Sequence, residues 1–145
     1  MGLDLELRHF DDALNGILAN AVLPGINGDA AIAWPEKVYV PTKGKPYLKP
    51  EMAGRARMPM GVGADSVQQW TGTYQVSVMV PRDTGTRLQN QLASAVIRAF
   101  RRGLSVTTPQ GIVLYVTSST VPAPVPFEDW INLPVQIQWF AHEPP

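Results

Sequence analysis

The stretch WTGTYQVSVMVPRDTGTRLQNQL, residues 70–92, changes its hydrophobic period within a few residues. Up to residue 80 apolar and polar side chains alternate, which predicts a strand over 67–80 with one buried and one polar face. After Gly85 apolar residues recur every three or four positions, which predicts an amphipathic helix over 86–102. A strand that is polar on one face is typical of an antiparallel sheet. The stretch therefore indicates a helix that packs on an antiparallel sheet.

The turn between the two predicted elements also has the order of a phosphate-binding loop, which is strand, glycine-bearing turn and helix. Such a loop of the Walker type needs Gly-Lys-Ser/Thr at the helix start, where the lysine and backbone amides meet the phosphates. The turn PRDTGTR (81–87) has one glycine, no lysine and an aspartate that would repel phosphate. We therefore interpret it as a strand-to-helix corner, with Thr84 or Thr86 as the helix cap and Gly103 as the helix stop.

The first part of the chain predicts one helix followed by irregular or extended structure. Apolar residues at three- and four-residue steps predict a helix over 3–22, which Pro24 and Gly25 end. Five prolines between 35 and 59 exclude a helix there and confine any strands to sheet edges or strand starts. The stretch RARMPMGVGADS (55–66) has no clear period and is interpreted as a long loop.

The last part of the chain predicts two more strands, over 111–120 and 130–141, separated by a proline-rich loop APVPFED (123–129). Pro134 cannot donate to a sheet ladder, so the final strand is expected at or near an edge. The order of elements predicts an α+β fold in one domain spanning 1–145. We expect a mostly antiparallel β-sheet with two α-helices packed on it.

Composition excludes several function classes. The 145 residues carry no cysteine, which removes disulfides, thiolate catalysis and cysteine-ligated metal sites, and which fits a reducing cytoplasm. The formal net charge is +0 and charged residues make up 17%, so no global basic field argues for nucleic-acid binding. The N-terminus has no signal-peptide pattern, and no apolar run is long enough to span a membrane.

Motifs for catalysis or metal binding are incomplete throughout the sequence. His9 and His142 stand alone at opposite ends, and no serine sits in a GxSxG elbow. The run GVGADS (61–66) lacks the third glycine of a dinucleotide fingerprint. A small hydrolase would need a pocket of convergent polar groups that no motif supplies. We expect no catalytic residue, no cofactor and no metal, and therefore no enzyme.

Two segments are candidates for partner contacts. A basic segment spans 37–57, and its lysines either discourage edge-to-edge strand pairing or, as the less favoured alternative, bind single-stranded nucleic acid. The stretch after it carries apolar, adaptable side chains that are equally consistent with a partner surface or with a slack loop. The candidate partner-interface residues are Lys43, Lys45, Arg55, Arg57, Met58, Met60 and Val62.

The sequence resembles the tail terminator proteins of long-tailed bacteriophages over nearly its whole length. The resemblance rests on IAWPEKVYVPTKGKPYL (32–48), WTGTYQVSVMVPRDTGT (70–86), AFRRG (99–103) and EDWINLPVQIQW (128–139), and the strand-Pro-turn-helix corner is its most specific part. It implies an α+β structural protein of the virion without catalytic residues.

The resemblance also implies a mode of assembly. Such proteins form a ring, typically a hexamer, which caps the tail tube, ends tube polymerisation and joins the head connector. DNA passes through the bore without sequence recognition, and assembly takes place in the host bacterial cytoplasm. A head-completion or stopper protein of the neck remains an alternative, and a nucleic-acid-binding module built on 37–57 is the alternative from another class.

Overall fold

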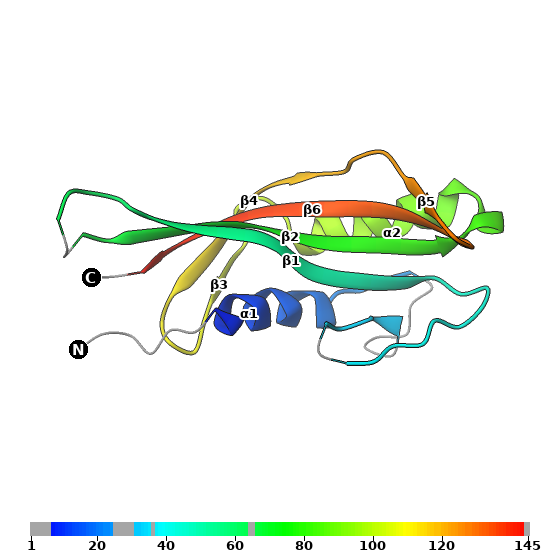
Figure 1. Ribbon diagram of the computed structural model, residues 1–145, viewed down its shortest axis with the longest axis horizontal. Coiled ribbons are helices and arrows are strands. Elements are labelled where there is room, and N and C mark those ends of the chain that lie inside the picture. Colours follow the sequence, from blue (N-terminus) through cyan, green and yellow to red (C-terminus); the bar gives the residue numbers. More distant parts are fainter. Residues whose placement is uncertain (1–6, 25–30, 36, 64–65, 144–145) are drawn as a thin grey trace.

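The computed structural model describes residues 7–24, 31–35, 37–63 and 66–143, and within them two helices lie on one six-stranded antiparallel sheet (Figure 1). The strand order is β1-β2-β6-β4-β3, and β5 pairs with β6. The predicted α+β class is therefore confirmed. The elements are α1 Arg8–Ala19, β1 Tyr47–Pro59, β2 Gln68–Pro81, η2 Arg82–Thr84, α2 Thr86–Ala99, β3 Ser105–Thr107, β4 Val113–Thr120, β5 Val125–Phe127 and β6 Trp130–Glu143.

Both helices pack on the same face of the sheet through residues four positions apart. In α1, Phe10, Leu14 and Leu18 are fully buried. In α2, Leu92 and Val96 occupy the same spacing. Since residues four apart lie on one helix face, each helix presents a continuous apolar stripe to the sheet. The sheet residues that meet these stripes are Tyr74, Val76, Val78 and Val80 on β2 and Leu133, Val135, Ile137 and Trp139 on β6.

The helices are shorter than predicted. α2 begins at Thr86 as expected, but Gly85 occupies the N-cap position with φ 80°, so neither threonine is the cap. It ends at Ala99 because Phe100 turns its ring into the core against Tyr74 (centroid distance 5.5 Å). α1 ends at Ala19, and Asn20 follows as its C-cap, with the side-chain Nδ2 and the backbone N–H both donating to the Gly16 carbonyl, at 2.9 and 3.3 Å. Residues 3–6 of the predicted first helix lie outside the described residues.

The predicted loop over 55–66 is wrong for its first half. β1 continues to Pro59 and pairs with β2 along its whole length, for example Arg55 with Gly72 and Pro59 with Gln68. Residues 55–59 are therefore one side of a long β-hairpin. The expectation that proline-rich strands lie at an edge is confirmed for β1, which is the outermost strand beside β2.

Pro134 was expected to place its strand at or near an edge of the sheet, and β6 is not an edge strand. β6 lies inside the sheet, where Pro134 is paired with Ser77 of β2. On the other side of β6, β4 pairs with residues 136–141 and β5 with residues 130–132. Pro134 falls between these two partners, so the break in the ladder that proline requires is present without an edge. β5 itself lies within the segment predicted as a proline-rich loop.

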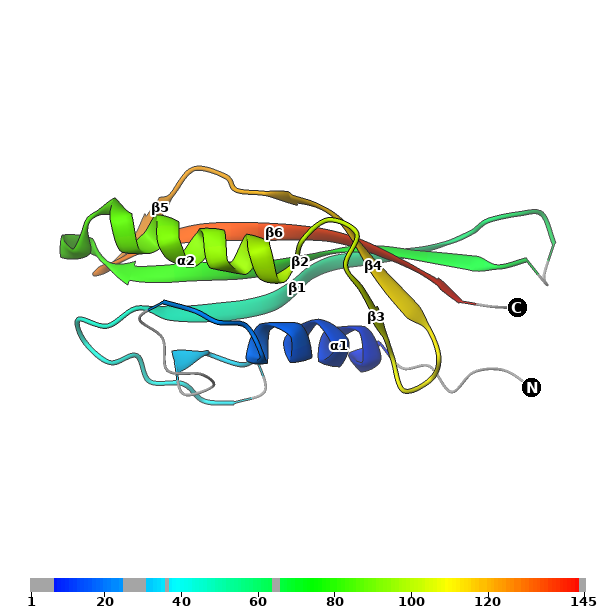
Figure 2. The ribbon, with the colours of Figure 1, turned by 180° about the vertical axis from the view of Figure 1, so that it is seen from behind.

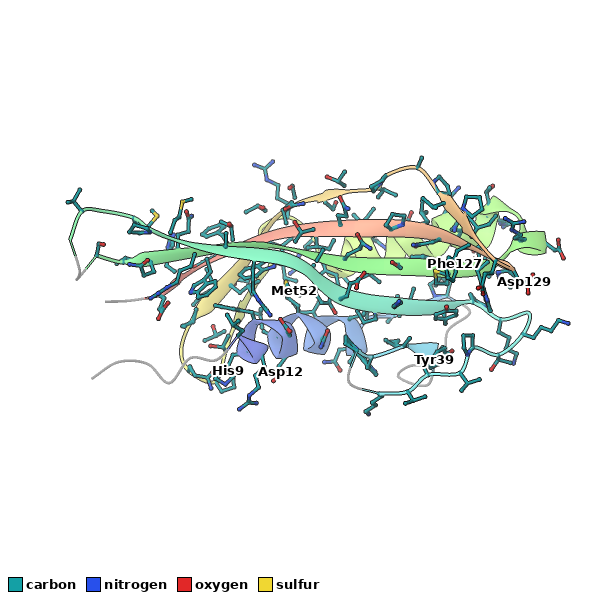
Figure 3. All side chains as sticks on the ribbon, in the orientation of Figure 1. His9, Asp12, Tyr39, Met52, Phe127 and Asp129 are labelled. Carbon is teal, nitrogen blue, oxygen red and sulfur yellow. The ribbon has the colours of Figure 1, made fainter. Side chains whose placement is uncertain are left out.

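Two irregularities of strand pairing meet at one row of the sheet. The register shifts between Met52 and Gly54 on β1, and again between Val116 and Ser118 on β4. Both shifts border the row in which Thr73 is paired with Gln138. A bulge bends its strand and increases the local twist, and β1 changes direction near its middle in Figure 1, where Figure 3 labels Met52.

Candidate functional site

The face of the sheet opposite the helices, here called the open face, is largely polar and is bound together by its own side chains. Gln136 Nε2 donates to Gln75 Oε1 at 3.3 Å, and Gln75 Nε2 donates to Glu51 at 3.4 Å. The Thr73 hydroxyl donates to Gln138 Oε1 at 2.9 Å. These pairs cross three strands and satisfy one another, so the open face offers a polar wall in which most amide and hydroxyl groups already have a partner.

A shallow hollow lies in the open face at the row of the two register shifts. Gly54, Gly72 and the residues around them line it, together with hydroxyl and amide side chains. Those side chains belong to Gln69, Thr71, Thr73, Thr117 and Gln138. No nucleophile with an adjacent base is among the lining residues. The hollow therefore has the chemistry of a contact surface rather than of a catalytic pocket.

The β1–β2 hairpin beyond this row, residues 55–71, is here called the hairpin arm. Figure 1 shows it reaching past the start of α1, away from the body of the fold. Its outer part exposes Met58 (52%), Met60 (55%) and Val62 (105%). Three exposed apolar side chains at one tip form an apolar patch, and such patches on a protein surface are typical of contact sites for a partner. The candidate residues Met58, Met60 and Val62 thus gather at one end of the molecule.

The two arginines of the hairpin arm make contacts within the chain. The Arg55 guanidinium forms an ion pair with Asp11 and donates to the Leu7 carbonyl at 3.3 Å, which ties β1 to α1. Arg57 Nε lies 3.2 Å from Glu143 Oε2, and its guanidinium lies 5.8 Å from the centre of the Trp70 ring. The side chain of Arg55 is only 23% exposed, so its first role is to fix the base of the arm.

Lys43 and Lys45 lie at the other end of the sheet. They are exposed in the segment that enters β1 at Tyr47, whereas Met58 is near the last residue of this thirteen-residue strand. The structure therefore does not bring the seven candidate residues together. It divides them between the hairpin arm and a second region, here called the loop end, which comprises residues 38–45, 81–85 and 127–130.

The loop end carries an aromatic cluster on the open face. Tyr47 packs against Tyr39 at 5.1 Å and against Trp130 at 5.1 Å, the latter edge to face. Burial raises the pKa of Tyr47 above its ordinary range, with smaller contributions from Tyr39 and Glu128. A hollow beside this cluster is lined by Lys43, Arg82 and Asp129 among others, and Figure 3 shows Phe127 and Asp129 close together there.

Several exposed apolar residues at or near the loop end were not among the sequence-based candidates. Val38 is 97% exposed, Val40 is 80% exposed and Phe127 is 58% exposed. Val125 precedes Phe127 on the same short strand and is 53% exposed. Proline density predicted a loop over 123–129 and irregular or extended structure around Val38 and Val40, and the apolar residues within these segments were the signal that could have identified them.

The corner 81–85, which has the order of elements of a phosphate-binding loop, is a structural joint. The corner 81–85 is held by the Arg82 amide, which donates to the Asp129 carbonyl at 3.1 Å, so it joins β2, α2 and the β5–β6 turn. Among the described residues no three His, Cys, Asp or Glu side chains are grouped as metal ligands. No helix in the described part of the chain is long and apolar enough to cross a membrane.

Comparison with known proteins identifies the chain. A solved protein structure with 20% sequence identity superposes with a TM-score of 0.71, covering 97% of this chain and 99% of that one, which supports the same fold. No curated protein sequence matches the chain. The family of phage tail terminator proteins matches residues 11–139, which include most of α1, all of α2 and most of the sheet. This chain therefore belongs to the phage tail terminator family and is a structural component that completes the tail.

Proposed function

We propose that the protein forms a ring of six subunits on the end of the tail tube. The ring stops addition of tube subunits, offers the head connector a joining surface and lets DNA pass through its bore without sequence recognition. Six is the number that the resemblance of the sequence to tail terminators implies. Assembly on the tube takes place in the host bacterial cytoplasm.

The free edge of β1 and the hairpin arm that continues from it are the observation that carries this proposal. In the described part of the chain, only Leu48 of β1 has an outer partner, through a bridge to Ile32. From Lys49 to Pro59 no strand in the described part of the chain pairs with the outer edge of β1. An unpaired edge that ends in an exposed apolar tip is a surface suited to a neighbouring subunit or to the tube.

The two ends of the subunit differ in chemistry, which supports two different partners. The hairpin arm ends in Met58, Met60 and Val62, whereas the loop end combines an aromatic cluster with Lys43, Arg82 and Asp129. Flexible methionines suit a surface that must fit a repeating partner. We assign the arm to the tube or the neighbouring subunit and the loop end to the neck.

A head-completion or stopper protein of the neck would use the same surfaces with different partners, and it remains the second candidate. The basic segment 37–57 as a nucleic-acid module has less support. Its Arg55 and Arg57 are engaged in ion pairs with Asp11 and Glu143.

Purified tail tubes mixed with the protein provide the test. Electron microscopy should show one ring per tube end, and native mass spectrometry of the released cap should give six subunits. Met58→Ser combined with Met60→Ser should leave the melting temperature within a few degrees, because both side chains are exposed, but should abolish capping. Val22→Ser, at a 92% exposed position outside the arm, is the matched control and should cap normally. A single bound subunit per tube, or normal capping by the double variant, would contradict the proposal.

A further inference from the structure

The outward face of α2 is polar along its whole length, and its only charges are positive. Figure 2 shows α2 running along the sheet with no other element in front of it. The helix contains no Asp or Glu, although its N-terminal turn would favour one. The exposed residues of the helix are Thr86, Arg87, Asn90, Gln91, Ser94 and Arg98, and exposed Arg101 and Arg102 follow its end.

These arginines have no acidic partner among the residues that the structure describes. Arg87, Arg98, Arg101 and Arg102 form no ion pair with any residue that the structure describes, whereas Arg55 and Arg57 do. The sequence has no Asp or Glu between Asp83 and Glu128. The formal net charge of +0 therefore conceals a local excess of positive charge on this side of the molecule.

The two arginines of the helix are placed to act on one extended ligand. Arg87 and Arg98 are eleven positions apart, close to three helical turns, so both lie on one face about 16 Å apart along the axis. A hollow beside the helix is lined by both arginines, by Asn90, Gln91 and Ser94 between them, and by Pro24. Guanidinium, amide and hydroxyl donors thus follow one line.

The composition of this face distinguishes nucleic acid from a protein partner. The centre of a protein–protein interface usually holds apolar or aromatic anchors, and the exposed residues of α2 include none. Contacts to a phosphate backbone come from Arg together with Ser, Thr, Asn and Gln side chains. We propose that the α2 face binds the phosphate backbone of duplex DNA without reading its sequence.

This inference goes beyond the proposed function, because a bore that lets DNA pass and a face that binds its phosphates are different properties. A single subunit carries the whole face. DNA binding can therefore be measured on the free protein, and its failure would leave the test on tail tubes unaffected.

Fluorescence anisotropy with short labelled duplexes of two unrelated sequences is the experiment. Both duplexes should bind equally, and binding should weaken as salt rises from about 50 to about 200 mM. Arg87→Gln combined with Arg98→Gln should reduce the slope of log affinity against log salt by about 2, since each phosphate contact contributes about 0.9. Arg101→Gln with Arg102→Gln gives a second, independent pair. Lys43→Gln with Lys45→Gln removes the same charge at the loop end and should change nothing.

The outcomes separate the explanations. Equal loss in the lysine control would mean that total charge matters rather than the α2 face, and it would overturn the proposal. So would absence of binding by the wild-type protein at low salt. Displacement of DNA by polyglutamate at equal charge concentration would assign the face to an acidic protein surface instead. Displacement only at a large excess supports DNA, because duplex DNA has the denser line of charge.

Discussion

At the scale of single residues, Gly72 allows the largest buried ring of the core to pack. A Cβ atom added at Gly72 would lie 2.6 Å from Cζ2 of Trp139 and 2.8 Å from the Gly54 carbonyl oxygen. Trp139 is 2% exposed and also contacts the Phe10 ring at 5.0 Å, so the indole has little room to move. The glycine is required by close approach rather than by backbone conformation.

Gly72→Ala should therefore lower the free energy of unfolding by about 1–3 kcal/mol, the usual effect of overpacking. Urea denaturation measures it. Gly16→Ala is the matched control, because nothing lies within 4 Å of a Cβ there and the position is inside α1. That change should raise the free energy of unfolding by about 0.5–1 kcal/mol. A stabilising effect of Gly72→Ala would show that the ring is not confined as described.

At this scale, the sequence did not predict which polar side chains are buried. Gln89 is 2% exposed, and its Nε2 donates to the Ile131 carbonyl at 3.1 Å, which joins α2 to β6. The Tyr74 hydroxyl donates to Asn15 Oδ1, and burial of the ring raises its pKa, followed by the charge of Asp11. In a sequence a glutamine within a helix looks like a surface residue, and only the tertiary position of its acceptor shows otherwise.

At the scale of elements, Leu92 is the centre of the apolar stripe of α2 and is fully buried. Leu92→Ala should cost about 2–5 kcal/mol of unfolding free energy, because the cavity under the helix cannot fully collapse. Chemical denaturation checks this, with Gln91→Ala on the exposed side as control, for which a change within about 0.5 kcal/mol is expected. A loss below about 1 kcal/mol would mean that α2 is not part of the core.

Elements in which the apolar residues keep one spacing throughout were predicted well. Strands in which a register shift moves the apolar residues to the other face were not. β2 and the start of α2 follow from the alternation and the three- to four-residue spacing around the corner. In β1, Leu48, Pro50 and Met52 share a face with core residues of β2, but after the register shift Arg55 and Arg57 take that face. A one-residue shift exchanges the two faces of a strand, so no single period runs through 47–59.

At the scale of the whole molecule, the sequence predicted the class of fold and the family but not the arrangement of the candidate contacts. Met58, Met60 and Val62 do lie together at an exposed tip. Lys43 and Lys45 lie at the opposite end of the molecule. The extended strand β1, which is 13 residues long, lies between them and the methionines, so residues that are near in sequence are far apart in space. Pro134 was misplaced because the gap between β4 and β5 depends on long-range pairing.

We expect the row where both register shifts meet to set the direction in which the hairpin arm leaves the body, because a bulge bends its strand. Deleting Ala53 would make the pairs Met52 with Tyr74 and Gly54 with Thr73 successive in an unbroken ladder, without exchanging the faces of the arm. We expect the variant to stay folded, by its melting curve, but to cap tubes poorly in electron micrographs. Normal capping would show that the shift is incidental.

In the proposed ring of identical subunits, any deviation in one subunit recurs in all of them. An angular error at the Thr73–Gln138 row is therefore multiplied by the number of subunits before the last meets the first. A small angular error therefore prevents the ring from closing, whereas a single subunit folds normally with the same error. At the two bulges, the insertion or deletion of one residue can therefore give a subunit that still folds but can no longer close the ring.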